Sequence, residues 1–265
     1  MFDSASRPNP AMSFLARVSL FASAALVSGA PGMQLFAQTR AAPHVTETVF
    51  ELASGEEMTY AISLPAGYDG DFDDPRPLIL VLHPGGRAPY YGSDFMRQIV
   101  DPALRGWGAV IVAPDVPTRS WATEGSEQAV LALLDDVLEN HTIDRTRILV
   151  TGFSMGGRGT WYMATRHADL FTGAIPIAGS RGDDSLDGLG AMPVFLIHSP
   201  DDEVVPYGPA EETAELLAER GHQVQMTKLA GASHYMMGDY IAPLRIAGEW
   251  MREQWQAGEV TEPSR

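Results

Sequence analysis

Short apolar runs, separated by polar segments rich in glycine and proline, recur along the chain from residue 46 onward. Two early runs, residues 46–52 and 58–64, flank Ser54 and Gly55 and predict a β-hairpin. The later runs are mostly unbroken and rich in β-branched residues, which is typical of parallel strands covered on both faces. These strands are predicted at residues 78–83, 108–114, 147–152, 173–179 and 193–199, with a last one at 223–230.

Helical patterns alternate with these strands. One predicted helix presents an apolar face to the sheet, formed by Val130, Leu133, Leu134, Val137 and Leu138. Further helices are predicted at residues 155–166, within residues 209–221 and at residues 243–255. The middle one has Pro209 in its first turn and Gly221 just past its end, which are helix start and stop signals. The alternation predicts a single α/β domain with a mostly parallel sheet.

The first 37 residues differ in kind from the rest. Arg7 and Arg17 precede an apolar run of small residues, 18–30, which is too short for a transmembrane helix and is typical of a secretory signal peptide. Cleavage after Ala30 or after Ala37 would fit the pattern. We therefore predict that the protein is exported to the periplasm or the medium. At the C-terminal end, we predict a disordered tail over residues 257–265.

Composition and charge exclude several classes of function. The net charge of −16, with no basic cluster to offset it, argues against nucleic acid and anionic membranes as partners. The sequence has no cysteine, which excludes disulfides, a thiol nucleophile, a cysteine-linked membrane anchor and a cysteine-ligated zinc. We expect neither a metal nor another cofactor.

Candidate chemistry lies in the stretch RILVTGFSMGGRGTW, residues 147–161, which places Ser154 between a predicted strand and a predicted helix. Gly152 and Gly156 stand two residues before and after it. The positive φ of a nucleophile elbow brings backbone into close contact at those two positions, so small residues are needed there. Gly157 would let the helix pack close to the sheet. The spacing predicts that Ser154 is a nucleophile.

A serine hydroxyl needs a general base within hydrogen-bond reach. Of the seven histidines, His234 lies in a loop after the last predicted strand and before the last helix. His83 and His198 end strands, and either fits a core position. His234 is the predicted base.

The base in turn needs an acid that holds it in one tautomer, and in an elbow-type hydrolase the acid follows a strand between the serine and the histidine. Asp201, Asp202 and Glu203 all follow the predicted strand 193–199. Their position in the turn does not choose among them.

Several segments together resemble the secreted esterase group of the α/β-hydrolases, which includes feruloyl-esterase-like and polyhydroxybutyrate-depolymerase-like enzymes and the so-called predicted peptidases. They are PLILVLHPGG, DRTRILVTGFSMGGRGTW, PVFLIHSPDDEVVP and GASH. The resemblance covers residues 45–256 and implies that they form the catalytic domain. The resemblance implies a mostly parallel central sheet with helices on both faces and an N-terminal antiparallel hairpin. The family's His-Gly-x-x-Asp-x-x-Val-Pro pattern aligns with residues 198–206 and implies that Asp202 is the acid. Ser199 replaces the usual glycine.

Two backbone N–H groups usually stabilise the oxyanion of ester cleavage. Met155 supplies one by its position after the nucleophile. The other is expected from the loop His83-Pro84-Gly85-Gly86, where the family commonly has His-Gly. Pro84 has no N–H, so we predict Gly85 as the donor and Gly86 as the alternative.

Aromatic residues follow these loops and suggest a pocket for an apolar or aromatic acyl group. The predicted substrate contacts are Tyr90, Trp121 and Tyr235. The sequence therefore predicts a secreted serine esterase that acts on small or polymer-borne esters, of feruloyl or polyester type. A serine peptidase acting on short peptides and a binding protein of the same fold without turnover are the alternatives.

Overall fold

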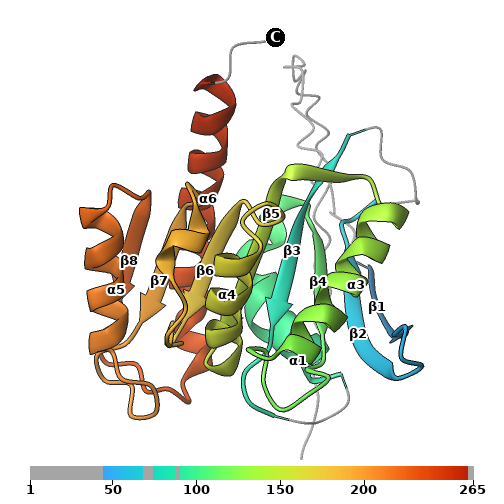
Figure 1. Ribbon diagram of the computed structural model, residues 1–265, viewed down its shortest axis with the longest axis horizontal. Coiled ribbons are helices and arrows are strands. Elements are labelled where there is room, and N and C mark those ends of the chain that lie inside the picture. Colours follow the sequence, from blue (N-terminus) through green and yellow to red (C-terminus); the bar gives the residue numbers. More distant parts are fainter. Residues whose placement is uncertain (1–43, 68–73, 87–89, 262–265) are drawn as a thin grey trace, which may run out of the picture. The chain divides into compact units, whose positions relative to one another are not determined.

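The computed structural model describes residues 44–67, 74–86 and 90–261. The predicted signal peptide, residues 1–37, lies outside the described residues. The described chain forms one eight-stranded sheet of order β1-β2-β4-β3-β5-β6-β7-β8 (Figure 1). Its strands are β1 (His44–Glu51), β2 (Glu57–Leu64), β3 (Arg76–Leu82), β4 (Val110–Pro114), β5 (Ile143–Phe153), β6 (Gly173–Ile177), β7 (Val194–His198) and β8 (Val224–Lys228).

The strand directions agree with the sequence analysis. β1 and β2 form an antiparallel hairpin, and β2 pairs antiparallel with β4. From β4 onward every pair is parallel. Both the mostly parallel sheet and the N-terminal hairpin are therefore confirmed.

Helices cover both faces of the sheet, and strand β3 shows why its sequence is apolar throughout. Leu78, Leu80 and Leu82 point into a core shared with α3, α4 and α5. Ile79 and Val81 point into a second core, shared with α2 and α6 on the other face. The helices are α1 (Tyr91–Phe95), α2 (Asp101–Leu104), α3 (Glu124–Asn140), α4 (Met155–Arg166), α5 (Gly208–Glu219) and α6 (Ile241–Thr261), with short turns η1 (Met96–Val100), η2 (Arg105–Trp107), η3 (Leu186–Leu189) and η4 (Met237–Tyr240).

Helix α6 corrects the prediction of a disordered tail. The tail was predicted to begin at residue 257, but the helix continues to Thr261. Trp255 holds the last packed turn, because its ring lies edge-on to Trp107 and its indole N–H donates to the Thr172 carbonyl oxygen at 2.9 Å. Adding residues to an existing helix requires no new nucleation, so the helix can continue beyond Trp255. Among the helices of the described ranges, none has the length and apolar character needed to cross a bilayer.

The carboxyl ends of the parallel strands meet at one edge, and helix α4 packs very close to that edge. A Cβ at Gly157 would lie 2.4 Å from the Ile177 carbonyl oxygen, and one at Gly179 would lie 2.5 Å from the carbonyl carbon of Gly157. These glycines let two backbones touch. Their contact sets the height of the first turn of α4 above strand β6.

We predict that Gly157→Ala lowers the free energy of unfolding by about 2 kcal/mol, because both groups that would clash are backbone and cannot rotate away. Alanine is otherwise the better helix former by up to about 1 kcal/mol, so an unconstrained site would show the opposite sign. Urea denaturation measures the difference. Gly238→Ala is the control, since no atom lies within 4 Å of a Cβ there. If the two variants were equally stable, this contact would not fix α4.

Candidate active site

Ser154 lies on the turn between β5 and α4, with φ 57° and ψ −113°, which is strained for a residue with a side chain. Its N–H donates to the Ile177 carbonyl oxygen at 2.9 Å, and its carbonyl oxygen accepts the N–H of Arg158. A Cβ at Gly152 or Gly156 would lie 2.5 Å or 1.8 Å from a backbone carbonyl oxygen. The geometry of a nucleophile elbow is therefore present, and both glycines are required by it.

His234 reaches Ser154 from the loop between β8 and η4. Its Nε2 lies 2.8 Å from Ser154 Oγ, and its Nδ1 lies 2.7 Å from Asp202 Oδ2. An ionised carboxylate only accepts hydrogen bonds, so Nδ1 carries the proton and Nε2 can accept the serine hydroxyl. The three residues singled out from the sequence thus meet in the tautomer that a general base requires.

The Asp202 carboxylate is fully buried, with a side-chain exposure of 0%. Its Oδ1 accepts the N–H groups of Val204 and Val205 at 2.9 and 2.8 Å, while Oδ2 accepts His234. Burial raises the pKa of Asp202, but the hydrogen bonds from His234 and the two N–H groups outweigh burial and bring the pKa below its usual value. Asp202 is consequently charged at neutral pH.

His198 supports this carboxylate from the end of β7. Its Nε2 lies 3.0 Å from the Val205 carbonyl oxygen and 3.3 Å from Asp202 Oδ2. Both neighbours are acceptors, so Nε2 is protonated and donates toward them. Burial lowers the pKa of His198, which keeps the ring neutral. Sequence reasoning gave His198 a core position but no part in the site; its spacing of four residues from Asp202 was the available signal.

The carboxylates on either side of the buried aspartate bind other atoms of the histidine loop. Asp201 Oδ2 accepts the Gly231 N–H at 2.6 Å. Glu203 accepts the Ser233 hydroxyl at 2.6 Å and the backbone N–H of His234 at 3.1 Å. Of the three acids left open by position, the middle one reaches the imidazole.

Aromatic rings support the imidazole on the side of helix α6. The Phe153 ring centroid lies 5.0 Å from that of His234 and 5.0 Å from that of Tyr240. Tyr240 is fully buried, and its hydroxyl has no hydrogen-bond partner within the described structure. Burial raises the pKa of Tyr240, so the phenol stays neutral beside the charged carboxylates. This position therefore uses the ring of Tyr240 rather than its hydroxyl.

His83 ties the predicted oxyanion loop to the end of β4. The Val116 N–H can only donate, so His83 Nε2 accepts it at 3.0 Å and Nδ1 donates to the Pro84 carbonyl oxygen at 2.6 Å. Burial lowers the pKa of His83 and favours this neutral form. Trp121 is only 1% exposed and donates its indole N–H to the His83 carbonyl oxygen at 2.9 Å. The predicted substrate contact of Trp121 is therefore wrong: the ring is core and supports the loop from beneath.

Gly85 and Gly86, the predicted donor and its alternative, have different surroundings. Gly85 is exposed and a Cβ there would meet no atom within 4 Å, whereas a Cβ at Gly86 would lie 2.4 Å from the Tyr91 ring. Tyr90, another predicted substrate contact, is half-buried and has φ 59°. Its N–H donates to the Asp115 carboxylate. Asp115 anchors this part of the loop, a role that the sequence did not suggest.

Exposed apolar side chains surround the histidine. Tyr235 is 75% exposed, Met236 is 49% exposed and Val204 is 46% exposed. The Tyr235 ring stands edge-on to the imidazole of His234, with centroids 5.8 Å apart. These side chains come from the two loops that carry Asp202 and His234, so they form a candidate surface for an apolar part of a substrate.

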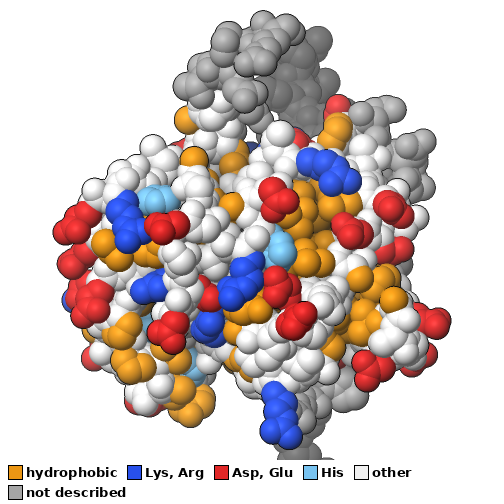
Figure 2. Space-filling model, in the orientation of Figure 1, with side chains coloured by type: hydrophobic (Ala, Val, Ile, Leu, Met, Phe, Trp, Pro, Cys, Tyr) orange, Lys and Arg blue, Asp and Glu red, His pale blue; other side chains and the backbone are white. Residues whose placement is uncertain are grey.

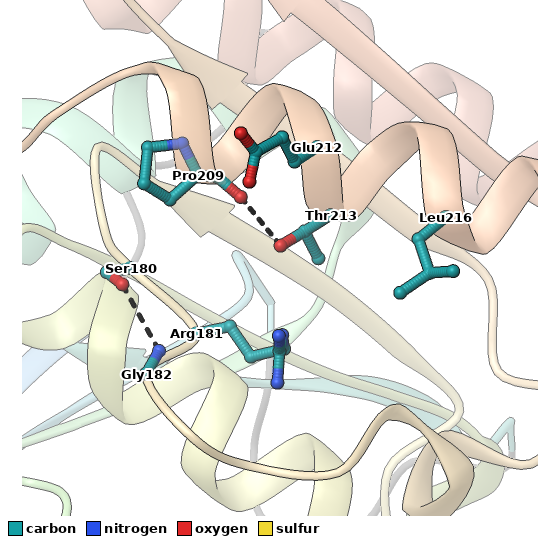
Figure 3. A pocket seen from close by; sticks show the side chains of 7 residues that line it. All are labelled: Ser180, Arg181, Gly182, Pro209, Glu212, Thr213 and Leu216. Atoms are coloured by element: carbon teal, nitrogen blue, oxygen red, sulfur yellow. Dashed lines mark hydrogen bonds between the residues drawn. The ribbon is translucent and has the colours of Figure 1, made fainter.

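A separate cavity of about 160 Å³ lies between residues 180–182 and helix α5 (Figure 3). Arg181 lines it from the loop and Glu212 from the helix, and none of the predicted site residues lines it. Acidic side chains are spread over the face of the molecule in Figure 2, and basic side chains lie near its middle and also toward its left, upper right and lower edges. In the part of the chain that the structure describes, no group of three or more His, Cys, Asp or Glu residues could hold a metal ion.

Comparison with known proteins links this geometry to esterases. The sequence is 27% identical over 141 residues to the bifunctional acetylxylan esterase/xylanase XynS20E of Neocallimastix patriciarum, covering 51% of this chain and 20% of that protein. It is 25% identical over 179 residues to feruloyl esterase D of Neurospora crassa, covering 60% of this chain and 58% of the relative. The crystal structure of a thermostable esterase matches with a TM-score of 0.69 at 26% identity, covering 79% of this chain and 62% of that one. The chain spans less than two thirds of each of these proteins.

Residues 106–245, just over half of the chain, match the family described as Phospholipase/Carboxylesterase. The matched range contains Ser154, Asp202 and His234, in the chain order expected of an α/β-hydrolase. The fold agrees as well, since the sheet and its helices superpose on those of an esterase. The chain therefore belongs to the phospholipase/carboxylesterase family and has the α/β-hydrolase fold.

Proposed function

We propose that the protein is a serine carboxylic-ester hydrolase with Ser154 as nucleophile, His234 as general base and acid, and Asp202 as the group that orients the histidine. One observation carries the proposal: an unbroken hydrogen-bonded chain from Ser154 Oγ through both imidazole nitrogens to a buried carboxylate. Family membership and the esterase names of the relatives support the same class of reaction.

The geometry suits a two-step reaction through an acyl-enzyme. Ser154 Oγ attacks the ester carbonyl carbon and gives its proton to His234 Nε2, while Asp202 stabilises the imidazolium. The proton then passes to the leaving alcohol oxygen as the C–O bond breaks. Water attacks the acyl carbon, its proton passes through the same nitrogen back to the serine, and the acid leaves.

The oxyanion that forms in each step needs donors on the opposite side from the histidine. Met155 is the first residue of α4, so its N–H precedes the intrahelical hydrogen bonds and is free for this purpose. Gly85 is our proposed second donor. Its exposure and open surroundings leave room for a substrate to approach the backbone.

We further propose that the acyl group is small and apolar or aromatic, as in feruloyl or polyester-type substrates. The exposed side chains of Tyr235, Met236 and Val204 beside the triad support this choice, because they can bury apolar substrate surface that is otherwise in water. The substrate is a small molecule or is borne on a polymer. The leader at residues 1–37 supports export of the protein, and the N-terminal sequence of the exported form would identify the cleavage site.

Purified protein should hydrolyse p-nitrophenyl esters, and Ser154→Ala should lower kcat by about 10⁴-fold or more, since the triad acts as a unit. A panel of acyl chain lengths, together with methyl ferulate and a peptide anilide, measures the preference. The variant should stay folded, because the hydroxyl lies on a partly exposed turn. It should also lose labelling by a fluorophosphonate. Faster turnover of the anilide than of the matched ester would point to a peptidase instead, and wild-type protein without turnover or labelling would point to a binding protein.

Asp201 and Asp202 are adjacent, so comparing their variants tests which of them orients His234. Asp202→Asn should cost about 10⁴-fold in kcat, because an amide can present its N–H₂ to Nδ1 and favour the wrong tautomer. Asp201→Asn should cost far less, since an asparagine oxygen still accepts the Gly231 N–H. Steady-state kinetics on one ester with both variants decides between them. Equal losses would mean that the assignment within the turn is mistaken.

A single position tests the second oxyanion donor. Gly85→Pro removes the N–H and should lower kcat by about 10² to 10³, the usual cost of one such donor. Gly85→Ala keeps the N–H, and its Cβ meets no atom within 4 Å, so this variant should turn over nearly as fast as the wild type. Circular dichroism checks that both variants fold. If the proline variant kept its kcat, the donor would be elsewhere, with Gly86 the next choice.

A further inference from the structure

Three consecutive carboxylates follow strand β7, and each accepts hydrogen bonds from a different part of the loop that carries His234. The turn itself makes this possible. Asp201 N–H donates to Ser199 Oγ at 3.1 Å, and Asp202 Oδ1 accepts two N–H groups ahead of it. In an extended segment, successive side chains would point to opposite sides. In this compact turn, all three carboxylates point toward the loop that carries His234.

The histidine loop has few other connections to the protein. Strand β8 is at the edge of the sheet, and its last backbone link to β7 is the Leu229 N–H donating to the His198 carbonyl oxygen at 2.9 Å. Beyond that point, the Met236 N–H bonds within the loop, to the Ser233 carbonyl oxygen. For residues 230–236 of the described chain, hydrogen bonds from the backbone to other segments go only to the carboxylates of Asp201 and Glu203.

Burial alone would not fix this loop. Ala232 and the His234 side chain are buried, but Gly231, Tyr235 and Met236 are exposed. Gly231 has φ +85°, so the chain turns sharply at the residue whose N–H donates to Asp201. A backbone shift of about 1 Å at the base can cost 10²-fold in rate, so the position of this loop matters to the reaction.

We propose that Asp201 and Glu203 are positioning residues that hold the backbone of the histidine loop, so that the imidazole keeps its distance to Ser154 through both half-reactions. This inference rests on the proposed function. Glu203 is the stronger of the two, because it binds the N–H of His234 itself and also the hydroxyl of the preceding Ser233. Asp201 fixes the start of the same loop at Gly231.

The role requires hydrogen-bond acceptors and not negative charge. Two further charges beside Asp202 repel it, so charge at these positions is unfavourable for the turn itself. The hydrogen bonds offset that cost: donation by Ser233 and by the His234 N–H lowers the pKa of Glu203 and keeps it ionised at neutral pH. A neutral side chain of the same shape should therefore position the loop nearly as well.

Kinetics of Glu203→Ala and Glu203→Gln on one p-nitrophenyl ester test the proposal. Glu203→Ala should lower kcat by about 10- to 100-fold with KM changed less than about 2-fold, because the loop positions the base and does not bind substrate. The rate of fluorophosphonate labelling of Ser154 should fall in parallel. In Glu203→Gln the amide oxygen can accept the His234 N–H, and the amide N–H₂ can donate to the Ser233 hydroxyl, which accepts as well as donates. This variant should therefore stay within about 3-fold of the wild type in both measurements.

Glu212→Ala is the matched control, an exposed glutamate on α5 outside the triad, and it should behave as the wild type. Asp201→Ala and Ser233→Ala are the second pair, and both should show smaller losses of kcat. Asp201→Ala removes the bond to the Gly231 N–H. Ser233→Ala removes the bond to Glu203 and the one from the Tyr235 N–H. Thermal unfolding accompanies each measurement. The proposal is overturned if Glu203→Ala keeps its kcat, if it changes KM alone, or if Glu203→Gln loses as much as Glu203→Ala. A wild-type protein without turnover would instead contradict the proposed function.

Discussion

The burial of one negative charge, on Asp202, constrains the whole site. An ionised carboxylate without solvent contact is costly unless donors surround it. Here the donors come from three different places: two N–H groups of the following turn, His198 at the end of β7, and His234 from the loop beyond β8. Satisfying one carboxylate therefore fixes a turn, a strand end and a loop at once.

The parallel sheet makes that convergence possible. Ser154 follows β5, Asp202 follows β7 and His234 follows β8, and the carboxyl ends of parallel strands lie at one edge (Figure 1). The strand ends alone do not bring the side chains of Ser154, Asp202 and His234 within hydrogen-bond distance of one another. Close glycine contacts fix the position of helix α4 against the end of strand β6, and the ring of Phe153 packs against the imidazole of His234.

Backbone strain gathers at the same edge. Outside glycine, the positive φ angles of the described residues are at Tyr90, Ser154 and Ala178, and all three lie in or beside the loops around Ser154. Each such residue costs of order 1–3 kcal/mol. Two apolar cores, one on each face of the sheet, bury the side chains that offset this cost. The loops can therefore take the shapes that the chemistry requires.

The sequence by itself determined the strands and the main helices and predicted the sharp turn at Ser154 and the loop position of His234, because each depends on local pattern: apolar runs, helix signals, or glycines at fixed offsets from Ser154. Position alone left three acids open, and it placed Trp121 against the substrate. The family pattern over residues 198–206 implied Asp202, but only the tertiary structure shows that this carboxylate reaches the imidazole and that Trp121 is buried. Which of three adjacent carboxylates meets the imidazole depends on how one turn faces a loop 30 residues away, and the burial of Trp121 depends on the loop packed above it. Contacts between distant segments leave no periodic trace in the chain, so local pattern cannot reveal them.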